Sequence, residues 1–203
     1  MQKQLTSFVL AILFGWLLGC NSNPVQAPDQ NSNQVSPVGQ KIQLLELPGT
    51  TGMNLAKTSS IASSILRWVS VDSGGDLESS EQFGTVTVTA TLSIPKKGLS
   101  EGRYISMMLD NSKLLQIEFN PEGLQFKVPA KLSCTATGLD LSSVPVGAEI
   151  KLYYCNQKTG TFEEMNSASI TYNRKSGTLT CLNAEIPHFS IYAFGYIKKY
   201  CDF

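Results

Sequence analysis

The chain has 203 residues, and its 16 Lys and Arg balance its 16 Asp and Glu. This balance gives no electrostatic reason to expect nucleic acid as a partner, because binding to phosphate backbones needs clustered cations. Hydrophobic residues make up 42% and charged residues 16%, a composition that argues against wholesale disorder and allows one packed domain.

The first 19 residues have the pattern of a secretory signal peptide. Lys3 makes the amino end positive, and residues 5–18 are almost wholly apolar. This stretch is shorter than the roughly 20 apolar residues that a membrane-spanning helix needs. It ends in Leu-Leu-Gly-Cys20, which resembles the lipobox of bacterial lipoproteins. The alternative is an uncleaved signal anchor with an incidental Cys20.

The lipobox resemblance implies that residues 1–19 are removed and that Cys20 carries lipid, palmitate included. Several acyl chains together hold a protein on a membrane far better than one, at about 0.8 kcal/mol per buried methylene. Asn21 follows the cysteine in place of the aspartate that retains lipoproteins in the inner membrane. We therefore expect a cell-envelope protein on the outer membrane or cell surface.

Residues 20–40 are expected to form a flexible, lipid-anchored linker. The segment is rich in Asn and Gln, contains three prolines, and has no apolar side chain larger than valine. It cannot bury enough apolar surface to offset the entropy of ordering. As a coil of about 20 residues it would span roughly 25 Å, so it serves as a spacer.

Residues 41–203 are expected to fold as an antiparallel β-sandwich, an all-β domain. In residues 85–94 Val, Ala, Leu and Ile alternate with Thr and Ser, which is typical of a strand with one buried face. Turn-forming residues separate the predicted strands at close spacing. The other predicted strands are residues 42–47, 65–71, 104–109, 114–119, 130–135, 149–155, 169–173, 177–182 and 188–197.

Three linked segments resemble the ZU-five domain, the β-sandwich of ankyrins, netrin receptors and zonula occludens scaffolds, in its bacterial surface form. They are Leu-Ser-Ile-Pro95, Phe-Asn-Pro-Glu-Gly-Leu-Gln-Phe126 followed by Pro-Ala-Lys-Leu132, and His-Phe-Ser-Ile-Tyr192. The resemblance covers residues 65–195. It departs from the family at Asn120, where glycine is more usual before proline. It implies a structural or protein-contact module without a cofactor.

The triple His188-Phe189-Ser190 carries a second implication of that resemblance. In self-cleaving relatives and in a nucleoporin, His-Phe-Ser marks a peptide bond that the protein breaks itself. Carried over, Ser190 attacks the Phe189 carbonyl with His188 as base, in an N-to-O acyl shift that water completes. The alternative is an ordinary last strand, with Phe189 and Ile191 in the core and His188 and Ser190 facing the other way.

Four cysteines remain beside the lipidation site: Cys134, Cys155, Cys181 and Cys201. In an exported domain they suit two disulfides, with three pairings open. Unpaired buried cysteines are the competing interpretation. No Cys-x-x-Cys spacing suggests a metal clamp, and we expect no metal site.

A calcium site and a contact face are the remaining candidates. Asp72, Asp76 and Asp110 lack the ligand spacing of a calcium loop, so we interpret them as turn carboxylates. Aromatic residues on strands are usually packing residues, yet Trp68, Tyr153 and Tyr154 would suit a sugar or protein contact face.

Three functions therefore remain open. The leading hypothesis is a lipid-anchored module that binds an envelope protein without turnover chemistry. The alternatives are a single-turnover self-cleaving module at Phe189-Ser190 and a carbohydrate-binding surface domain.

Overall fold

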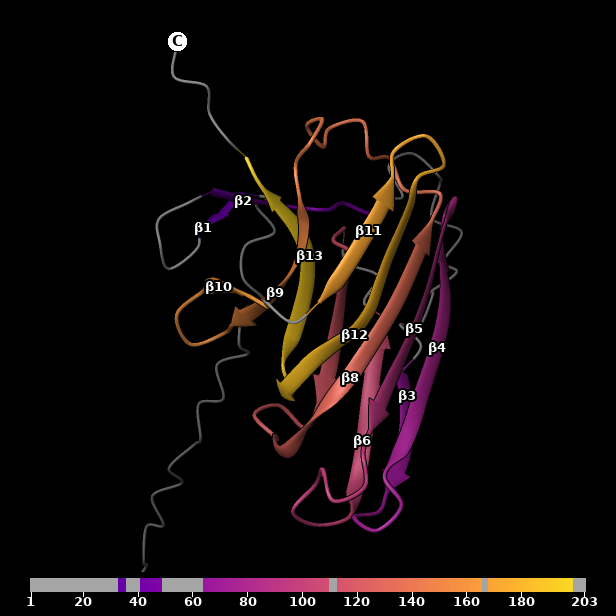
Figure 1. The fold of residues 1–203 in the computed structure, drawn as a ribbon, viewed down its shortest axis with the longest axis vertical. Coiled ribbons are helices and arrows are strands. Elements are labelled where there is room, and N and C mark those ends of the chain that lie inside the picture. Colours follow the sequence, from indigo (N-terminus) through magenta and orange to yellow (C-terminus); the bar gives the residue numbers. More distant parts are fainter. Residues whose placement is uncertain (1–32, 36–40, 49–63, 110–112, 166–167, 199–203) are drawn as a thin grey trace, which may run out of the picture.

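The computed structural model describes residues 33–35, 41–48, 64–109, 113–165 and 168–198, and every regular element in them is a β-strand. The strands form two antiparallel sheets that lie one behind the other in Figure 1. The expectation of an all-β antiparallel sandwich is confirmed. Within the described residues, no helix has the length and apolarity needed to cross a membrane.

The five-stranded sheet follows the alternation seen in the sequence. In β5, apolar side chains are buried at every second position and the intervening Thr and Ser are more exposed, as expected for a strand with one face on the core. Its strands run in the order β11 (Ser169–Asn173), β12 (Thr178–His188), β8 (Gln125–Thr137), β5 (Val86–Ile94) and β4 (Gly75–Phe83).

Strand β4 is an edge strand that the sequence analysis did not predict. Nine residues pair it with β5, although six of its nine side chains are Asp, Glu, Gln or Ser. Only Leu77 and Ser79 are buried, and the Ser79 hydroxyl has no hydrogen-bond partner among the described residues. Two inward side chains are too few to produce a clear apolar alternation.

The larger sheet has eight strands and is organised around the last strand, β13. β9 pairs along one side of β13, while β7 and β2 pair with successive parts of the other side. Its strands are β1 (Asn33–Val35), β2 (Lys41–Leu44), β13 (Ile191–Ile197), β7 (Gln116–Asn120), β6 (Arg103–Leu109) and β3 (Ser64–Val69), with β9 (Ile150–Asn156) and β10 (Thr161–Glu164) beside β13.

Strand β1 lies within the segment that we expect to be a linker. Its three residues pair antiparallel with β2, and Asn33 is opposite Gln43. The rest of residues 20–40 lies outside the described residues, as do the predicted cleavage site and Cys20.

The main hydrophobic core fills the space between the sheets, and a smaller cluster lies on the other face of the eight-stranded sheet. Successive side chains of a strand point to opposite faces, so Leu152 and Tyr192 belong to the main core while Tyr153 and Ala193 belong to the second cluster. The second cluster is Ile42, Leu44, Leu114, Tyr153, Cys155, Phe162 and Ala193.

Candidate functional sites

The His188-Phe189-Ser190 triple lies where the chain passes from one sheet to the other. β12 ends at His188 in the five-stranded sheet, and β13 begins at Ile191 in the eight-stranded sheet. The prediction of one continuous strand over residues 188–197 is therefore wrong. Simple alternation also fails, because Phe189 and Ser190 are both buried and Ile191 is only partly buried.

Phe189 is a core residue that fixes this crossover. Its ring stacks on that of Phe119 at 5.4 Å between centroids and meets Phe126 edge to face at 4.9 Å. A fully buried aromatic side chain in such a cluster contributes strongly to stability. Its truncation to alanine typically lowers the free energy of unfolding by about 3–5 kcal/mol. Its place in the core confirms that part of the sequence interpretation.

Backbone hydrogen bonds hold the peptide unit between Phe189 and Ser190. The Gly123 N–H donates to the Phe189 carbonyl oxygen at 2.9 Å, and the Phe189 N–H donates to Leu124 at 2.8 Å. The Ser190 carbonyl accepts the Phe119 N–H at 3.0 Å. Gly123 thus places one donor where negative charge would develop if a nucleophile attacked the Phe189 carbonyl.

The nucleophile and base of the self-cleavage hypothesis are close in sequence but are not joined. The Ser190 hydroxyl donates to the Cys155 carbonyl at 3.3 Å. The His188 ring meets the Tyr154 ring edge to face at 4.5 Å, and the His188 carbonyl accepts the Tyr192 hydroxyl at 2.7 Å. No hydrogen bond links the His188 ring to the Ser190 hydroxyl within the described residues.

Tyr154 lies between the two residues and faces several negative groups. Burial raises the pKa of its hydroxyl, and the charges of Glu163, Cys155 and Glu122 raise it further, while a hydrogen bond with Ser190 opposes them. A tyrosine held neutral in this way remains a proton donor. A neutral phenol is not a base, so Tyr154 does not replace His188 as the group that would take the Ser190 proton.

The cysteines that the structure describes are free thiols, and two of them face each other. Cys134 of β8 and Cys181 of β12 are direct partners in the five-stranded sheet. Burial raises the pKa of both thiols, to about 11 for Cys181. Cys155 is in the other sheet, where burial and then the Glu122 charge raise its pKa to about 11. Cys201 lies outside the described residues.

An exposed apolar surface lies on the β3–β6 pair, and we call Leu66, Trp68 and Tyr104 the contact face. Their exposed fractions are 65%, 54% and 62%. Trp68 and Tyr104 are cross-strand partners whose rings meet edge to face at 5.2 Å. Leu66 lies two residues from Trp68 and therefore points to the same side.

The tryptophan of the contact face is held by the loop before β6. A Cβ on Gly102 would lie 2.9 Å from Cζ2 of Trp68, so the indole packs directly against the glycine. The neighbouring residue on β3, Arg67, donates a hydrogen bond from its guanidinium to the Asp76 carbonyl oxygen at 2.6 Å. The contact face is thus an ordered surface. Of the aromatic candidates, Tyr153 is buried and Tyr154 is partly buried, which leaves Trp68 exposed.

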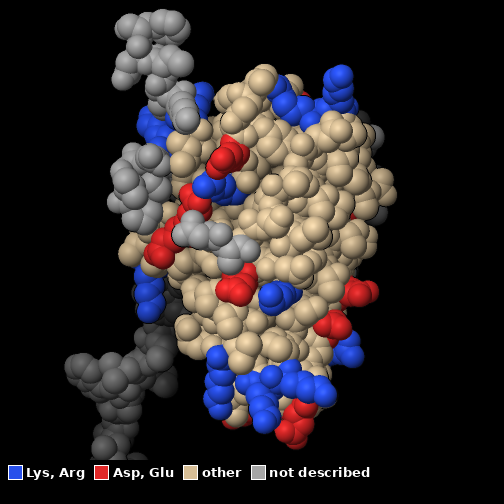
Figure 2. Space-filling view, viewed as in Figure 1, with Lys and Arg blue, Asp and Glu red and all other residues tan. Residues whose placement is uncertain are grey.

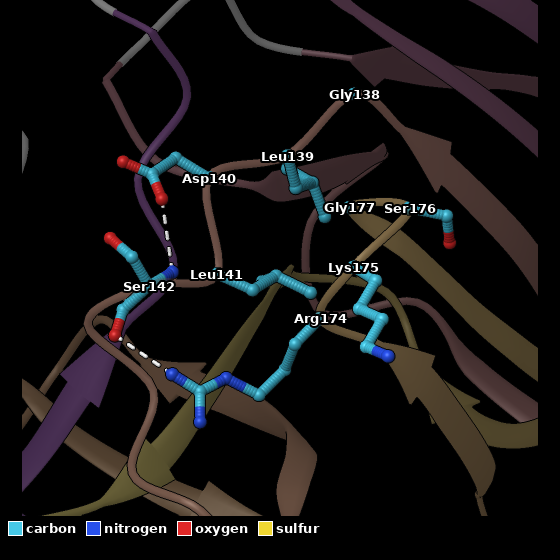
Figure 3. A pocket seen from close by; sticks show the side chains of 9 residues that line it. All are labelled: Gly138, Leu139, Asp140, Leu141, Ser142, Arg174, Lys175, Ser176 and Gly177. Atoms are coloured by element: carbon cyan, nitrogen blue, oxygen red, sulfur yellow. Dashed lines mark hydrogen bonds between the residues drawn. The ribbon is translucent and has the colours of Figure 1, made fainter.

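A hollow of about 680 Å³ with mixed polar and apolar lining lies at the end formed by the β8–β9 loop and the β11–β12 turn, shown in Figure 3. Arg174 donates to the Ser142 carbonyl at 3.0 Å, and the Ser142 N–H donates to Asp140 at 2.9 Å. This last bond lowers the Asp140 pKa. The hollow is wide and open, and the sequence analysis did not identify it.

Among the residues that the structure describes, the acidic side chains are not clustered as a metal centre would require. Asp72 and Asp76 are exposed, and Asp110 lies outside the described residues. The described part of the chain contains no group of three or more His, Cys, Asp or Glu side chains placed to hold a metal ion.

Two important residues of these sites were missed in the sequence. Tyr104 carries no local signal of exposure, because strand alternation does not tell which face remains uncovered. Gly123 was part of the turn in the ZU-five resemblance, but its bond to Phe189 depends on tertiary contact.

No family model matches the chain, and no match was found among curated proteins.

Proposed function

We propose that the chain is a lipid-anchored protein of the cell envelope whose β-sandwich is a binding or scaffolding module without turnover chemistry. The contact face carries this proposal. Isolated apolar residues on a surface are ordinary, but adjacent large ones mark interaction sites. Trp and Tyr are also the residue types enriched where proteins bind partners.

The ZU-five resemblance supports the same function, since the domain is a protein-contact module in that family. The antiparallel sandwich agrees with the fold class that the resemblance implies. The partner would be an envelope protein, and an ordered aromatic pair would supply its central contact at low cost in side-chain entropy.

The anchor at Cys20 would place this module on the outer membrane or cell surface. Cys20→Ser is expected to abolish acylation, because a serine oxygen does not replace the thiol in this chemistry. Metabolic labelling with a fatty acid measures the outcome. Labelling that persists in the variant contradicts the assignment of Cys20.

The binding test compares two sets of exposed side chains. The full-length protein is immobilised and offered separated envelope proteins and glycans. Trp68→Ala with Tyr104→Ala should reduce binding at least tenfold without a large change in melting temperature, as expected for central aromatic contacts. Leu182→Ala is the matched control, because Leu182 is 51% exposed but lies on the other sheet.

A carbohydrate-binding domain would use the same face, with sugar rings packed against Trp68. Saturable binding of a glycan, lost in the double variant, would favour this alternative over a protein partner. Equal binding by the double variant and the wild type would remove the contact face from both functions.

A self-cleaving module is the other candidate, and the Gly123 N–H bond to the Phe189 carbonyl is the observation that favours it. The missing bond between the His188 ring and Ser190 weighs against it. A base must come within hydrogen-bond reach of the nucleophile for proton transfer. We therefore place this function second.

A further inference from the structure

Positively charged side chains gather at one end of the sandwich. Lys96 and Lys97 are exposed in the loop between β5 and β6. The Lys127 N–H donates to the Gly98 carbonyl at 2.8 Å, which brings a third exposed lysine to this loop. Figure 2 shows Lys and Arg crowded at the lower end, where Figure 1 places the loop before β6. We call Lys96, Lys97 and Lys127 the basic end.

Carboxylates offset only part of this charge. Glu101 lies in the same loop and is ion-paired with Arg103. Asp72 follows Val71, whose carbonyl accepts the Lys97 N–H at 2.7 Å. None of the three lysines has an ion pair within the described residues. The side chains of this end therefore leave a net positive charge.

The excess does not continue up the outer face of the five-stranded sheet. The next row pairs Asp76 with Ser93, Ser93 with Lys131, and Lys131 with Glu185, so that acidic and basic groups alternate. Glu122 lies on the neighbouring β7–β8 turn, where its charge acts on Tyr154. The positive excess of the basic end thus stops at this row of strand residues.

Lys97 occupies a backbone conformation that favours glycine. Its φ is +60°, at the third position of a turn in which the Gly98 N–H donates to the Pro95 carbonyl at 3.0 Å. Glycine or asparagine normally fills such a position because a Cβ is strained there. A lysine in this strained conformation is consistent with a use for its charge.

We propose that the basic end docks on an anionic lipid surface. The proposal rests on the proposed function, in which the chain is already held at a membrane. The acyl chains expected on Cys20 would hold the protein at the membrane, and a basic patch would add electrostatic attraction between the domain and an anionic bilayer. Each lysine near an anionic bilayer strengthens binding by about fivefold, since its attraction is about 1 kcal/mol.

The shape of this end favours a lipid surface over a discrete anion site. Lys96 and Lys97 are exposed in a loop, and Lys127 is exposed near the start of β8. Neither the hollow of Figure 3 nor a second hollow beside β9 includes any of the three lysines. A selective site for one anion is normally concave, with converging donors. An anionic lipid surface is flat and its headgroups are mobile. Accessible cations therefore suffice to bind it, and a concave site is not required.

The test uses full-length protein purified from membranes and reconstituted into vesicles of phosphatidylcholine, with or without phosphatidylglycerol. Acetylation of each lysine is followed by mass spectrometry. Phosphatidylglycerol should slow acetylation of Lys96, Lys97 and Lys127 several-fold. Lys175 lies in the turn between β11 and β12, which is at the opposite end of the domain in Figure 1, and its acetylation should be unaffected. High salt should remove the protection, because exposed charges are then screened.

Variants separate loss of charge from loss of fold. Lys97→Gly should raise the melting temperature by relieving the positive φ, and should weaken the attraction to anionic vesicles by about fivefold. Lys96→Gln with Lys127→Gln should weaken it further, while Arg174→Gln with Lys175→Gln, the matched control, should not. Equal protection of Lys97 and Lys175, or equal losses in both pairs of variants, would overturn the proposal.

Two further readouts complete the test. Inorganic phosphate should displace the basic end no better than sodium chloride of equal ionic strength, and stronger displacement would indicate a discrete phosphate site instead. Failure of the protein to associate with phosphatidylcholine vesicles would contradict the anchor of the proposed function. Uniform lysine acetylation in vesicle-bound protein would contradict only the docking of the basic end.

Discussion

Cys134 and Cys181 stand directly opposite each other on β8 and β12, and both side chains are buried between the sheets. Direct partners in an antiparallel pair have Cα atoms about 4.5–5.5 Å apart. Disulfides span about 4.4–6.8 Å between Cα atoms, so the backbone is within range. Of the pairings left open by the sequence, this one joins adjacent strands, whereas Cys155 is in the other sheet.

The first prediction is that protein from an oxidising compartment carries a Cys134–Cys181 disulfide. The bond should stabilise the domain by about 2–4 kcal/mol, because it closes a long loop in the unfolded chain. Alkylation in denaturant without reductant should leave both cysteines unmodified. Cys155→Ala should not change this result. Full modification of Cys134 and Cys181 in the wild type would show that they remain thiols.

The second prediction concerns the bond between Phe189 and Ser190. We expect an intact chain for the wild type, Ser190→Ala and Ser190→Cys after denaturation, because Ser190 bonds to Cys155 rather than to the His188 ring. Mass spectrometry of the denatured proteins measures this. A fragment beginning at Ser190 in the wild type and Ser190→Cys, but not in Ser190→Ala, would establish self-cleavage.

The third prediction tests a turn that builds the hollow of Figure 3. Gly138 has φ +81°, and a Cβ there would lie 2.3 Å from the Thr85 carbonyl oxygen. Gly138→Ala should reduce the free energy of unfolding by about 3–4 kcal/mol. Gly147, with φ +79° and open space around it, is the matched control.

Gly147→Ala should cost only about 1–2 kcal/mol, the strain of the left-handed conformation alone. Chemical denaturation of both variants gives the comparison. Equal losses would mean that the neighbouring strand moves aside, and that the contact with Thr85 does not constrain the turn.

The fourth prediction is a loss of stability at alkaline pH. Burial raises the pKa of Cys155 from 9.0 to about 11 and that of Tyr153 from 10.0 to about 12. A folded-state pKa above the unfolded value means that the stabilisation is complete below the unfolded pKa and is lost as pH rises through the folded one. For Cys155 the window is therefore pH 9 to 11.

The thiol should account for about 2–3 kcal/mol of this loss. Cys155→Ala should flatten the dependence of unfolding free energy on pH across the window, whatever its effect at pH 7. Urea denaturation at a series of pH values measures the slope. An unchanged slope in the variant would assign the alkaline loss to other groups.

The sequence predicted the fold class because apolar alternation is physically tied to one buried face. β5 shows it best, and its pattern holds at every position from Val86 to Ile94. β4 was not predicted, because an edge strand with mainly solvent-facing polar residues shows little alternation between apolar and polar side chains. β10 was missed as well, since four residues are too few to establish a period.

The candidate sites were less predictable because they depend on contacts between distant segments. The sequence identified His188-Phe189-Ser190, but it did not show that the chain changes sheets there or that Gly123 meets the Phe189 carbonyl. The sequence identified Trp68 as a candidate for a contact face, but it did not identify its partner Tyr104. Pairing of β3 with β6 creates that surface by placing Trp68 opposite Tyr104. A local pattern does not encode the register of two strands that are far apart in the chain.

The central position of β13 has a consequence for how the protein is made. β2 and β7 meet the same side of this last strand, and β9 meets the other, so the larger sheet remains open until residues 191–197 are present. A chain made amino end first therefore has residues 1–190 outside the ribosome before this sheet closes. Such late, non-local closure should make folding slow, and it leaves the edges of β2, β7 and β9 open to wrong pairing until β13 is in place.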